Sequence, residues 1–555
     1  MSVGRRDFIV GTLGTAAAAR LLAGCGDDAS GFDEDVAALA LDTTRFTHGV
    51  ASGDPTASAV ILWTRAVAGD AQASMVEWVI AKDTALKQIV QHGVAESSPS
   101  SDFTVKVDVT NLDAGSTYYY AFFVSGVARS VIGRTRTLPK TAERARIAFT
   151  SCANYQYGYF NAYRAIARRS DLDLWLHIGD YIYEYKVGEY PEVPVEGRSH
   201  VPANEAITLA DYRGRYAQYR SDPDLAEVHR QLPLIIIWDD HEFANNAWTG
   251  GAENHTEGAE GTWVDRKRAA AQAFLEWQPI RATMAEPVPK IFRSFQFGDL
   301  FDLIMLDTRM WARSQQAGPD GSFDGKNVGE PAQWLDPARH IVGDDQEGWI
   351  EAQLGASKTR GAHWRLVGNQ VIFSQGRAPL DSRNPKYILF SDFWDGYQYD
   401  RNRVLDYVAN NGVQNTVFMT GDIHSSWAIE ISKDPFSPDV YDPANGKNGI
   451  AVELVGPSVT SEALETSPAL AAAAPGLLHG SNPHVVYSEF TRKGYVLIDV
   501  DATRLQAEWW YVDDIKTQNA SEAAAKIFTV QSNSARLVET TTPSPAAANP
   551  PAPAP

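Results

Sequence analysis

The 555-residue chain has little cysteine, few basic residues for its acidity and no long apolar run. Cys25 and Cys152 are its two cysteines, which excludes a fold held together by a framework of disulfides. Its formal net charge of -20 makes nucleic acid and anionic lipid poor bulk partners, because binding to them depends on clustered Lys and Arg. We therefore expect no nucleic-acid-binding surface. The length and the 44% hydrophobic content suffice to bury a large core in more than one domain.

The first 25 residues resemble an export signal. Gly4–Ile9 is similar to a twin-arginine signal, and the apolar stretch after it is too short to span a bilayer. Leu22–Cys25 matches a bacterial lipobox, so we expect a lipidated Cys25 to be the only membrane attachment. Plain signal-peptidase cleavage near the alanine-rich run is the alternative. The expected route is the Tat translocon, leading to the periplasm or cell surface, with residues 26–45 as a linker.

Two folded regions are predicted between this linker and the C-terminal end. Residues 46–138 contain short apolar or alternating runs separated by turn residues, which predicts an all-β, immunoglobulin-like sandwich. Residues 139–530 alternate strands with amphipathic helices, which predicts a layered α/β domain with a central sheet. The polar, Gly-rich segment 245–262 is predicted to be a long loop near the site. The Pro/Ala-rich residues 531–555 are predicted to be disordered.

Chemically active side chains follow four apolar runs that predict buried strands. The motifs are Gly179–Tyr183, Trp238–Glu242 and Gly421–His424, with Cys152 after the run Ile147–Thr150. Carboxylate, phenol and imidazole groups delivered from successive strand ends are what a two-metal hydrolytic centre requires. Each residue alone has a structural alternative, such as a helix cap for Asp180 or core packing for Cys152. Their joint occurrence favours a metal centre.

The donor atoms divide into two sets by their chemistry. A phenolate bonds well to Fe(III), and a thiolate and an imidazole can complete that set. The first set is Cys152, Asp180, Tyr183 and His424, and the second is Asp180, Asp240, Asn369 and Asp422. The second set offers only oxygen, which suits Ca²⁺, Mg²⁺ or Mn²⁺. Asp180 can serve both, because its two oxygens can bind different ions.

Taken together, these motifs resemble the PhoD-like alkaline phosphatase D family of metallophosphoesterases, which is related to purple acid phosphatases. The matching stretches are Ser151–Asn154, Gly158–Arg164, His177–Tyr185, Asp211–Pro223, Trp238–Asn246, Gly368–Gln370, Trp394–Tyr397, Gly421–Trp427 and Asn482–His484. They cover roughly residues 46–530, including an N-terminal β module that the family carries. The resemblance implies a layered metallophosphoesterase sandwich with central β-sheets and flanking helices.

The resemblance also implies an activity and cofactors. It implies hydrolysis of phosphate esters with Fe(III) and Ca²⁺, for which Mn²⁺, Mg²⁺ or Zn²⁺ could substitute. The superfamily's Gly-Asn-His-Asp/Glu motif corresponds to Asp239–Glu242, so Asp240 takes a metal-ligand position and His241 the catalytic one. The superfamily's opening Asp-x-His is absent, and Cys152 stands in its place. Asn369 takes a ligand role on the same match.

We expect a metal-activated hydroxide to attack phosphorus, with His241 stabilising the phosphoryl oxygens or protonating the leaving group. Asn154 could hydrogen-bond the substrate or cap a helix. Arg309 could bind phosphate bidentately or form a buried ion pair with Asp307. The expected protein is a monomeric phosphomonoesterase with some diesterase activity. A phospholipase D-like phosphodiesterase acting on phospholipids or teichoic-acid-like polymers, and a non-catalytic cell-surface binding protein, are the alternatives.

Overall fold

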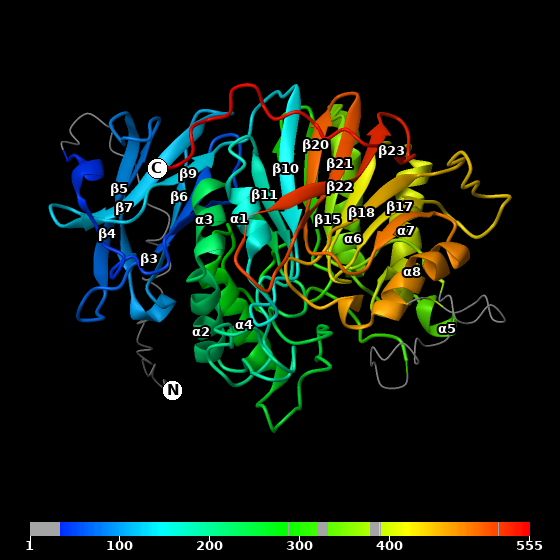
Figure 1. Cartoon of the computed structure of the whole chain (residues 1–555), viewed down its shortest axis with the longest axis horizontal. Helices are drawn as coiled ribbons and strands as arrows, with labels where there is room; N and C mark the ends of the chain where they lie inside the picture. The colour runs from blue at the N-terminus through cyan, green and yellow to red at the C-terminus, as the bar shows by residue number, and fades with distance from the viewer. Residues whose placement is uncertain (1–33, 287, 319–330, 378–387, 389, 520) are drawn as a thin grey trace, which may run out of the picture.

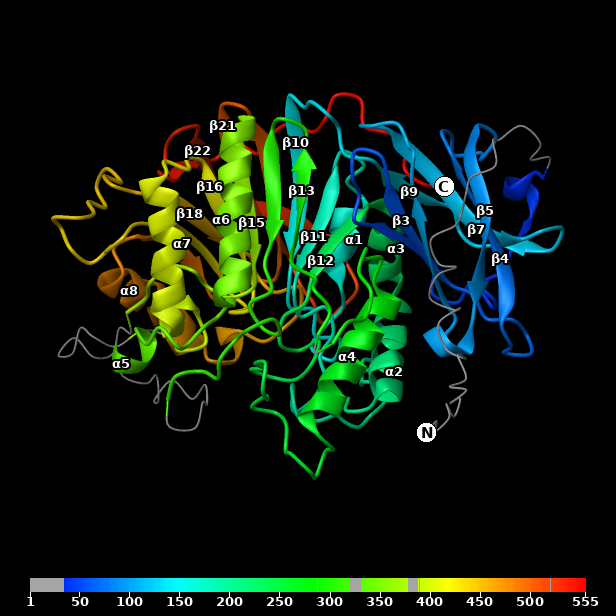
Figure 2. The ribbon, with the colours of Figure 1, turned by 180° about the vertical axis from the view of Figure 1, so that it is seen from behind.

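The computed structural model describes residues 34–286, 288–318, 331–377, 388, 390–519 and 521–555 (Figure 1). The expected signal, the lipobox with Cys25 and the first part of the linker lie outside the described residues. Two large β-sheets form the centre of the molecule, and a smaller sheet lies at the end that contains the N-terminal module (Figures 1 and 2). This layered arrangement agrees with the predicted fold class.

The smaller sheet has six strands and belongs to the N-terminal module. In spatial order they are β1 (Ala40–Leu41), β8 (Ala128–Arg129), β7 (Thr117–Val124), β4 (Ser74–Ala81) and β5 (Ile89–Ser97), with β9 (Gly133–Arg136) paired to β7. Its apolar face packs on strands of the neighbouring sheet through Val76, Trp78 and Tyr120. The predicted all-β sandwich is therefore present.

The second sheet has ten strands and passes from the sandwich into the α/β region. In order they are β23 (Val538–Thr540), β22 (Glu522–Gln531), β21 (Arg504–Val512), β20 (Gly494–Asp501), β10 (Arg144–Thr150), β11 (Leu174–Ile178), β12 (Leu234–Ile237), β2 (Val50–Gly53), β3 (Val60–Arg65) and β6 (Thr104–Val109).

The N-terminal module shares this sheet, whereas we expected it to be separate. Leu234 of β12 pairs with Gly53 of β2 in parallel register. Because side chains alternate along a strand, Leu62 packs in the sandwich core while Trp63 packs in the core of the α/β region. The sequence patterns of these short strands carry no information about this pairing partner.

The third sheet has seven strands and completes the centre of the α/β region. In order they are β13 (Arg293–Phe297), β14 (Phe301–Met305), β15 (Trp364–Asn369), β16 (Thr416–Thr420), β18 (Ala451–Val455), β17 (Ser426–Ile431) and β19 (Val485–Glu489). One of its faces shares the main core with the ten-stranded sheet, through Leu303 and Leu366 together with Ile147 and Leu176. The opposite face packs under helices through Ile304 and Phe418.

Helices cover the outer faces of both large sheets (Figures 1 and 2). They are α1 (Asn161–Ala167), α2 (Leu209–Arg220), α3 (Pro223–Gln231), α4 (Trp263–Trp277), α5 (Pro331–Trp334), α6 (Gly343–Arg360), α7 (Gln398–Asn410) and α8 (Pro468–Ser481). Short 3-10 turns are η1 (Val36–Ala38), η2 (Pro99–Ser101), η3 (Trp394–Tyr397) and η4 (Leu464–Thr466). Helix α2 buries Tyr212, Tyr216 and Tyr219, which lie at helical spacing. Among the described helices, none combines the length and apolar character needed to cross a bilayer.

The C-terminal end is ordered along the surface, whereas its composition predicted disorder. Residues 541–555 run in an extended path from β23 toward the N-terminal module, where the C-terminus lies (Figure 1). Arg146 donates to the Pro545 carbonyl at 2.8 Å, and Arg134 donates to that of Pro551 at 3.3 Å. A Pro/Ala segment keeps all its carbonyl acceptors, so the fold can bind it by supplying donors from elsewhere.

Candidate metal centre

The candidate site lies where strands of both large sheets end. β10, β11 and β12 are parallel neighbours in one sheet, and β15 and β16 are parallel neighbours in the other. Cys152, Asp180 and Asp240 follow the first three strands, and Asp422 and His424 follow β16. Because parallel strands end at the same edge, residues far apart in sequence meet there.

The structure brings the first expected donor set together. Sγ of Cys152, a carboxylate oxygen of Asp180 and a ring nitrogen of His424 all lie within 4.8 Å of one another. The Tyr183 hydroxyl donates to Oδ2 of Asp180 at 3.0 Å and lies 3.1 Å from Nε2 of His424. Nδ1 of His424 donates to the Glu462 carbonyl at 2.6 Å, because a carbonyl can only accept. Nε2 is therefore the ring nitrogen left for a metal ion.

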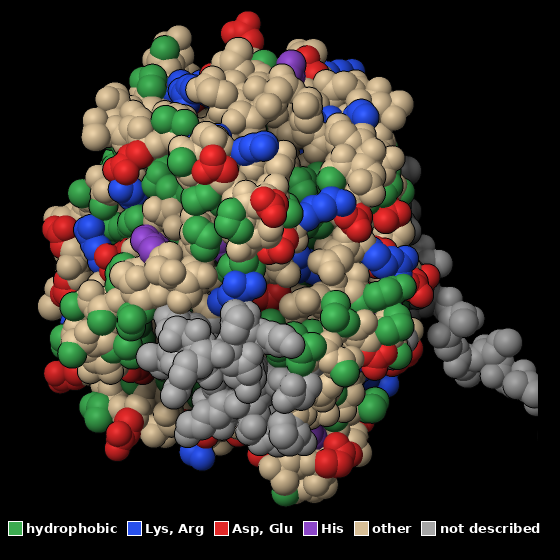
Figure 3. All heavy atoms as spheres, turned by 90° about the vertical axis from the view of Figure 1, so that its right-hand side faces the viewer, with side chains coloured by type: hydrophobic (Ala, Val, Ile, Leu, Met, Phe, Trp, Pro, Cys, Tyr) green, Lys and Arg blue, Asp and Glu red, His purple; other side chains and the backbone are tan. Residues whose placement is uncertain are grey.

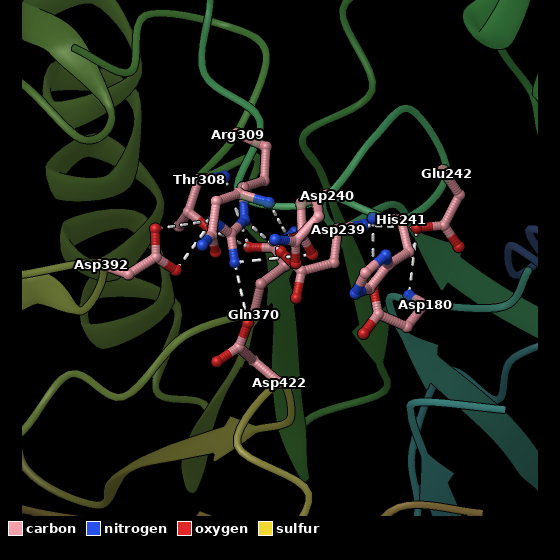
Figure 4. Close-up of polar contacts among 12 residues, drawn as sticks. Asp180, Asp239, Asp240, His241, Glu242, Thr308, Arg309, Gln370, Asp392 and Asp422 are labelled. Atoms are coloured by element: carbon pink, nitrogen blue, oxygen red, sulfur yellow. Dashed lines mark hydrogen bonds and ion pairs between the residues drawn. The ribbon is translucent and has the colours of Figure 1, made fainter. Parts of the chain in front are cut away.

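A second group of carboxylates adjoins the first through Asp180, and its aspartates are drawn in Figure 4. Oxygens of Asp239, Asp240 and Asp422 lie within 4.8 Å of one another, and Asp180, Asp240 and His241 form an overlapping group. Asp180 thus belongs to groups on both sides, and its role as a bridging ligand stays a prediction. Asp239 is an addition that we did not predict as a ligand, although its place beside Asp240 was a visible signal.

Four of these donors have a left-handed backbone conformation. Cys152, Asp180, Asp422 and His424 have positive φ angles of 60°, 54°, 61° and 58°. A left-handed conformation is costly for cysteine and histidine, and it persists at a site that requires a particular side-chain direction. Gly179 has φ 108°, and a Cβ there would lie 2.3 Å from Cβ of Asp239. Glycine therefore allows Asp180 and Asp239 to approach each other.

Arg309 is fully buried among the carboxylates rather than paired with Asp307. Its guanidinium forms ion pairs with Asp239, with Asp392 at 2.9 Å and with Asp422 at 2.8 Å (Figure 4). An oxygen of Asp307 instead accepts the backbone N–H of Arg309 at 3.0 Å. The buried ion pair we considered is thus present, but with different partners. Arg309 offsets part of the negative charge of the acids, and its role in phosphate binding stays a prediction.

Two asparagines use their amides within the fold. Oδ1 of Asn369 accepts from the indole N–H of Trp394 at 2.9 Å, and Nδ2 donates to Thr420 at 3.2 Å. Asn154 donates to the Tyr190 carbonyl at 3.1 Å and accepts the backbone N–H of Gln156, so it closes a turn rather than capping a helix. These contacts leave the ligand role of Asn369 and the substrate role of Asn154 as predictions.

His241 has a carboxylate partner that the sequence analysis missed. Oε2 of Glu184 lies 2.8 Å from Nδ1 of His241, and Glu184 is completely buried. Its other oxygen accepts the backbone N–H of Asn245 at 2.7 Å. Glu242 is also structural, because it accepts the backbone N–H of Asp180 at 3.0 Å and that of Asp239 at 2.8 Å. Both glutamates hold the loops that carry the donors.

The pKa values of the site residues are shifted because many acidic groups are buried close together. Burial raises the pKa of Asp180 and that of Asp422 well above their usual values, and neighbouring aspartates add to the rise. Burial also raises the pKa of the Cys152 thiol and of the Tyr183 phenol. Burial alone would lower the pKa of His241, but Asp240, Glu184 and Asp180 raise it well above its ordinary value. Bound cations would reverse the cost of ionising these acids.

Two further observations indicate that these donor groups are suited to metal ions. Among the described residues, Oδ2 of Asp239 and Oδ1 of Asp240 are buried without a hydrogen-bond partner. A buried carboxylate oxygen without a donor is costly, and a cation satisfies it. The thiol, phenol and imidazole of the first group suit a transition metal, and the oxygens of the second suit a hard divalent cation. The expected metal sites are chemically consistent with the structure.

Paired β-sheets with helices outside, and acidic and soft donors at the strand ends, are the arrangement expected of a metal-dependent phosphoesterase. The chain belongs to the PhoD-like phosphatase family. The family's phosphatase model matches residues 147–509, and the model of its N-terminal domain matches residues 34–139. The expected family is thereby confirmed, and with it a phosphoric ester hydrolase.

Individual relatives agree with this assignment. Alkaline phosphatase D of Bacillus subtilis (strain 168) is 34% identical over 505 residues, which cover 89% of this chain and 82% of the relative. A solved structure of PhoD superposes with a TM-score of 0.79 at 32% identity, covering 90% of this chain and 93% of that one. A purple acid phosphatase from yellow lupin, at 13% identity and a TM-score of 0.50, covers 87% of this chain and 73% of its own and shares the fold.

Proposed function

We propose that this phosphatase hydrolyses phosphomonoesters, with weaker activity on diesters, using Fe(III) beside one or more Ca²⁺ ions. The observation that carries the proposal is the shared position of Asp180 between a group with Cys152 and His424 and a group with Asp240. Cys152, Asp180, Tyr183 and His424 would hold Fe(III). Asp180, Asp240 and Asp422 would hold Ca²⁺, with Asp239 as an additional oxygen donor and Asn369 as the family match implies.

Residues of the chain would have separate roles in the reaction. Bound metal ions would lower the pKa of a solvent molecule and neutralise phosphate charge. Asp180 contacts both groups of donors. Its Oδ2 accepts a hydrogen bond from the Tyr183 hydroxyl, and its Oδ1 accepts the backbone N–H of His241 at 3.3 Å. His241 holds a proton that it could give to the leaving oxygen, and Glu184 fixes the orientation of its ring.

Substrate preference and metal identity can be tested together. Protein prepared from its exporting host would be analysed for iron and calcium, and turnover on phenyl phosphate compared with turnover on bis-phenyl phosphate. We expect faster monoester hydrolysis and a visible charge-transfer band that weakens in Tyr183→Phe. A preparation that is active, colourless and free of iron would exclude the iron half of the proposal. Faster diester hydrolysis would reverse the assigned preference.

Export and anchoring belong to the same proposal. We infer that the twin-arginine segment directs Tat export and that Cys25 carries a lipid at the periplasmic or cell surface. Replacing both Arg5 and Arg6 by Lys should block export, and Cys25→Ala should release the enzyme from the membrane fraction. On the face seen in Figure 3, Lys and Arg are scattered among Asp and Glu. Sedimentation should give the mass of a monomer.

A further inference from the structure

A single loop contacts three of the four donors in the first group. It follows β18 and leads to η4, and it includes Ser458, Thr460, Ser461 and Glu462. The backbone N–H groups of Thr460 and Ser461 each lie 3.3 Å from the Cys152 carbonyl. The Glu462 carbonyl accepts from His424, and the Ser461 hydroxyl lies 2.6 Å from the Tyr183 oxygen. The loop therefore touches the thiol, imidazole and phenol residues at once.

Ser461 is the side chain at the centre of these contacts. Its Oγ is 2.6 Å from the Tyr183 oxygen and 2.9 Å from the Cys152 carbonyl, and the residue is completely buried. The loop is fixed on either side of it: Oγ of Ser458 donates to the Ser461 carbonyl at 2.8 Å, and Thr460 donates to the Asn154 carbonyl at 2.7 Å. The hydroxyl is thus held beside the phenol by a braced backbone.

We propose that Ser461 is a positioning residue whose hydroxyl donates a hydrogen bond to the Tyr183 phenolate when this tyrosine binds Fe(III). In the metal-free protein the Tyr183 hydroxyl donates its own proton to Asp180. A tyrosine that binds a metal ion has lost that proton, so its oxygen can only accept. The Ser461 hydroxyl has a single proton and two acceptors in reach, and it favours the charged phenolate over the neutral Cys152 carbonyl.

This hydrogen bond has an electronic consequence. Donation to the phenolate stabilises the oxygen lone pairs and so raises the energy of charge transfer from Tyr183 to Fe(III). Partners of a metal ligand also commonly contribute about 10–100-fold to metal affinity or activity. The inference rests on the proposed function, because it requires Fe(III) on Tyr183. A role in tying the loop to Cys152 alone would leave the charge-transfer energy unchanged.

The test compares Ser461→Ala and Ser461→Thr with wild type after metal removal and reloading with Fe(III). At equal iron content, we expect the visible band of Ser461→Ala to move to longer wavelength and its iron affinity to fall about 10-fold. Ser461→Thr keeps the hydroxyl and should keep the wild-type band. Ser458→Ala is the matched control, because it removes a buried hydroxyl from the same loop while Thr460 still fixes the loop and the Ser461 hydroxyl stays in place. Its band should also stay at the wild-type position.

The outcomes distinguish a failure of the Ser461 role from a failure of the proposed iron centre. An unchanged band in Ser461→Ala, with a coloured wild type, overturns the role of Ser461 and leaves the proposed function intact. A wild type that takes up no Fe(III), or stays colourless with it, overturns the iron centre and this inference together. Should Ser461→Ala fail to fold, resonance Raman of the wild type replaces it. The phenolate C–O stretch should shift on exchange into D₂O, and an unshifted stretch overturns the hydrogen bond.

Discussion

Glu184 accepts a hydrogen bond from Nδ1 of His241 at 2.8 Å, and this contact fixes the way His241 faces the carboxylates. Burial opposes ionisation of Glu184, but His241 and nearby donors lower its pKa overall, so it accepts as a carboxylate. With Nδ1 protonated and engaged, Nε2 is left for the substrate. The pair joins a loop after β11 to a loop after β12.

Glu184→Gln should therefore impair catalysis without removing metal. We expect kcat to fall about 10–100-fold and the pH profile to change, because a neutral amide no longer stabilises the charged ring. His241→Ala should lower kcat further, by about 10²–10⁴-fold, with metals retained. Steady-state kinetics and elemental analysis on the same preparations check both. Loss of metal in His241→Ala would instead make this histidine a ligand.

Asp180→Asn should remove both metals and activity, because Asp180 belongs to groups on both sides of the centre. The expected loss of activity exceeds the roughly 10–100-fold typical of residues that merely support a ligand. Asp113→Asn is the matched control, since Asp113 is an exposed acid paired with Lys82 on the surface. Activity and metal content near wild type in Asp180→Asn would contradict the assignment.

Metal-free protein should lose stability as the pH rises. Burial raises the pKa of Asp239 to about 6 and that of Glu242 to about 8. Buried histidines such as His177 and His424 act in the opposite sense below about pH 6.5, because burial lowers their pKa to about 3. The net fall in the free energy of unfolding is therefore expected between about pH 7 and about pH 8, where Glu242 still holds its proton in the folded state. Metal binding needs ionised ligands, so loaded protein should show the opposite trend.

Thermal unfolding at about pH 7 and about pH 8, with and without a chelator, measures this difference. The chelated protein should have its higher melting temperature at the lower pH. If its melting temperature instead rose with pH, the acids would be ionised without metal, and the charge of Arg309 would be enough to balance them.

Deleting residues 541–555 should lower stability and spare activity. Arg134 and Arg146 would keep buried donors without the carbonyls of Pro551 and Pro545, at a cost of about 1–3 kcal/mol for each unsatisfied donor. A shorter deletion of residues 551–555 should give an intermediate loss, because it frees Arg134 but keeps the Pro545 contact. Equal melting temperatures for all three chains would mean that the tail contributes no stability.

Most of the strand pattern was predictable from the sequence. Strands β16 and β18 are short, fully buried and rich in apolar residues, which is the pattern that predicts buried strands. The sandwich strands were equally visible, but their sharing of a sheet with β12 was not. Backbone pairing leaves no side-chain signature of the partner strand. The C-terminal tail differs from its predicted disorder for a related reason. Its composition does not show that residues far away in the sequence supply hydrogen-bond donors to it.

The candidate site was likewise predictable from the sequence only in part. The sequence by itself determined the donor types, because Cys152, Asp180, Tyr183, Asp422 and His424 stand directly after strand-like runs. Only the tertiary structure decided which acids share a pocket, and it added Asp239, Asp392 and Glu184 while pairing Arg309 with the acids instead of Asp307. The order of the strands shows that the donors meet at one edge of the sheets. Which side chains then contact one another depends on loop conformation and packing, and the chain acquires these only on folding.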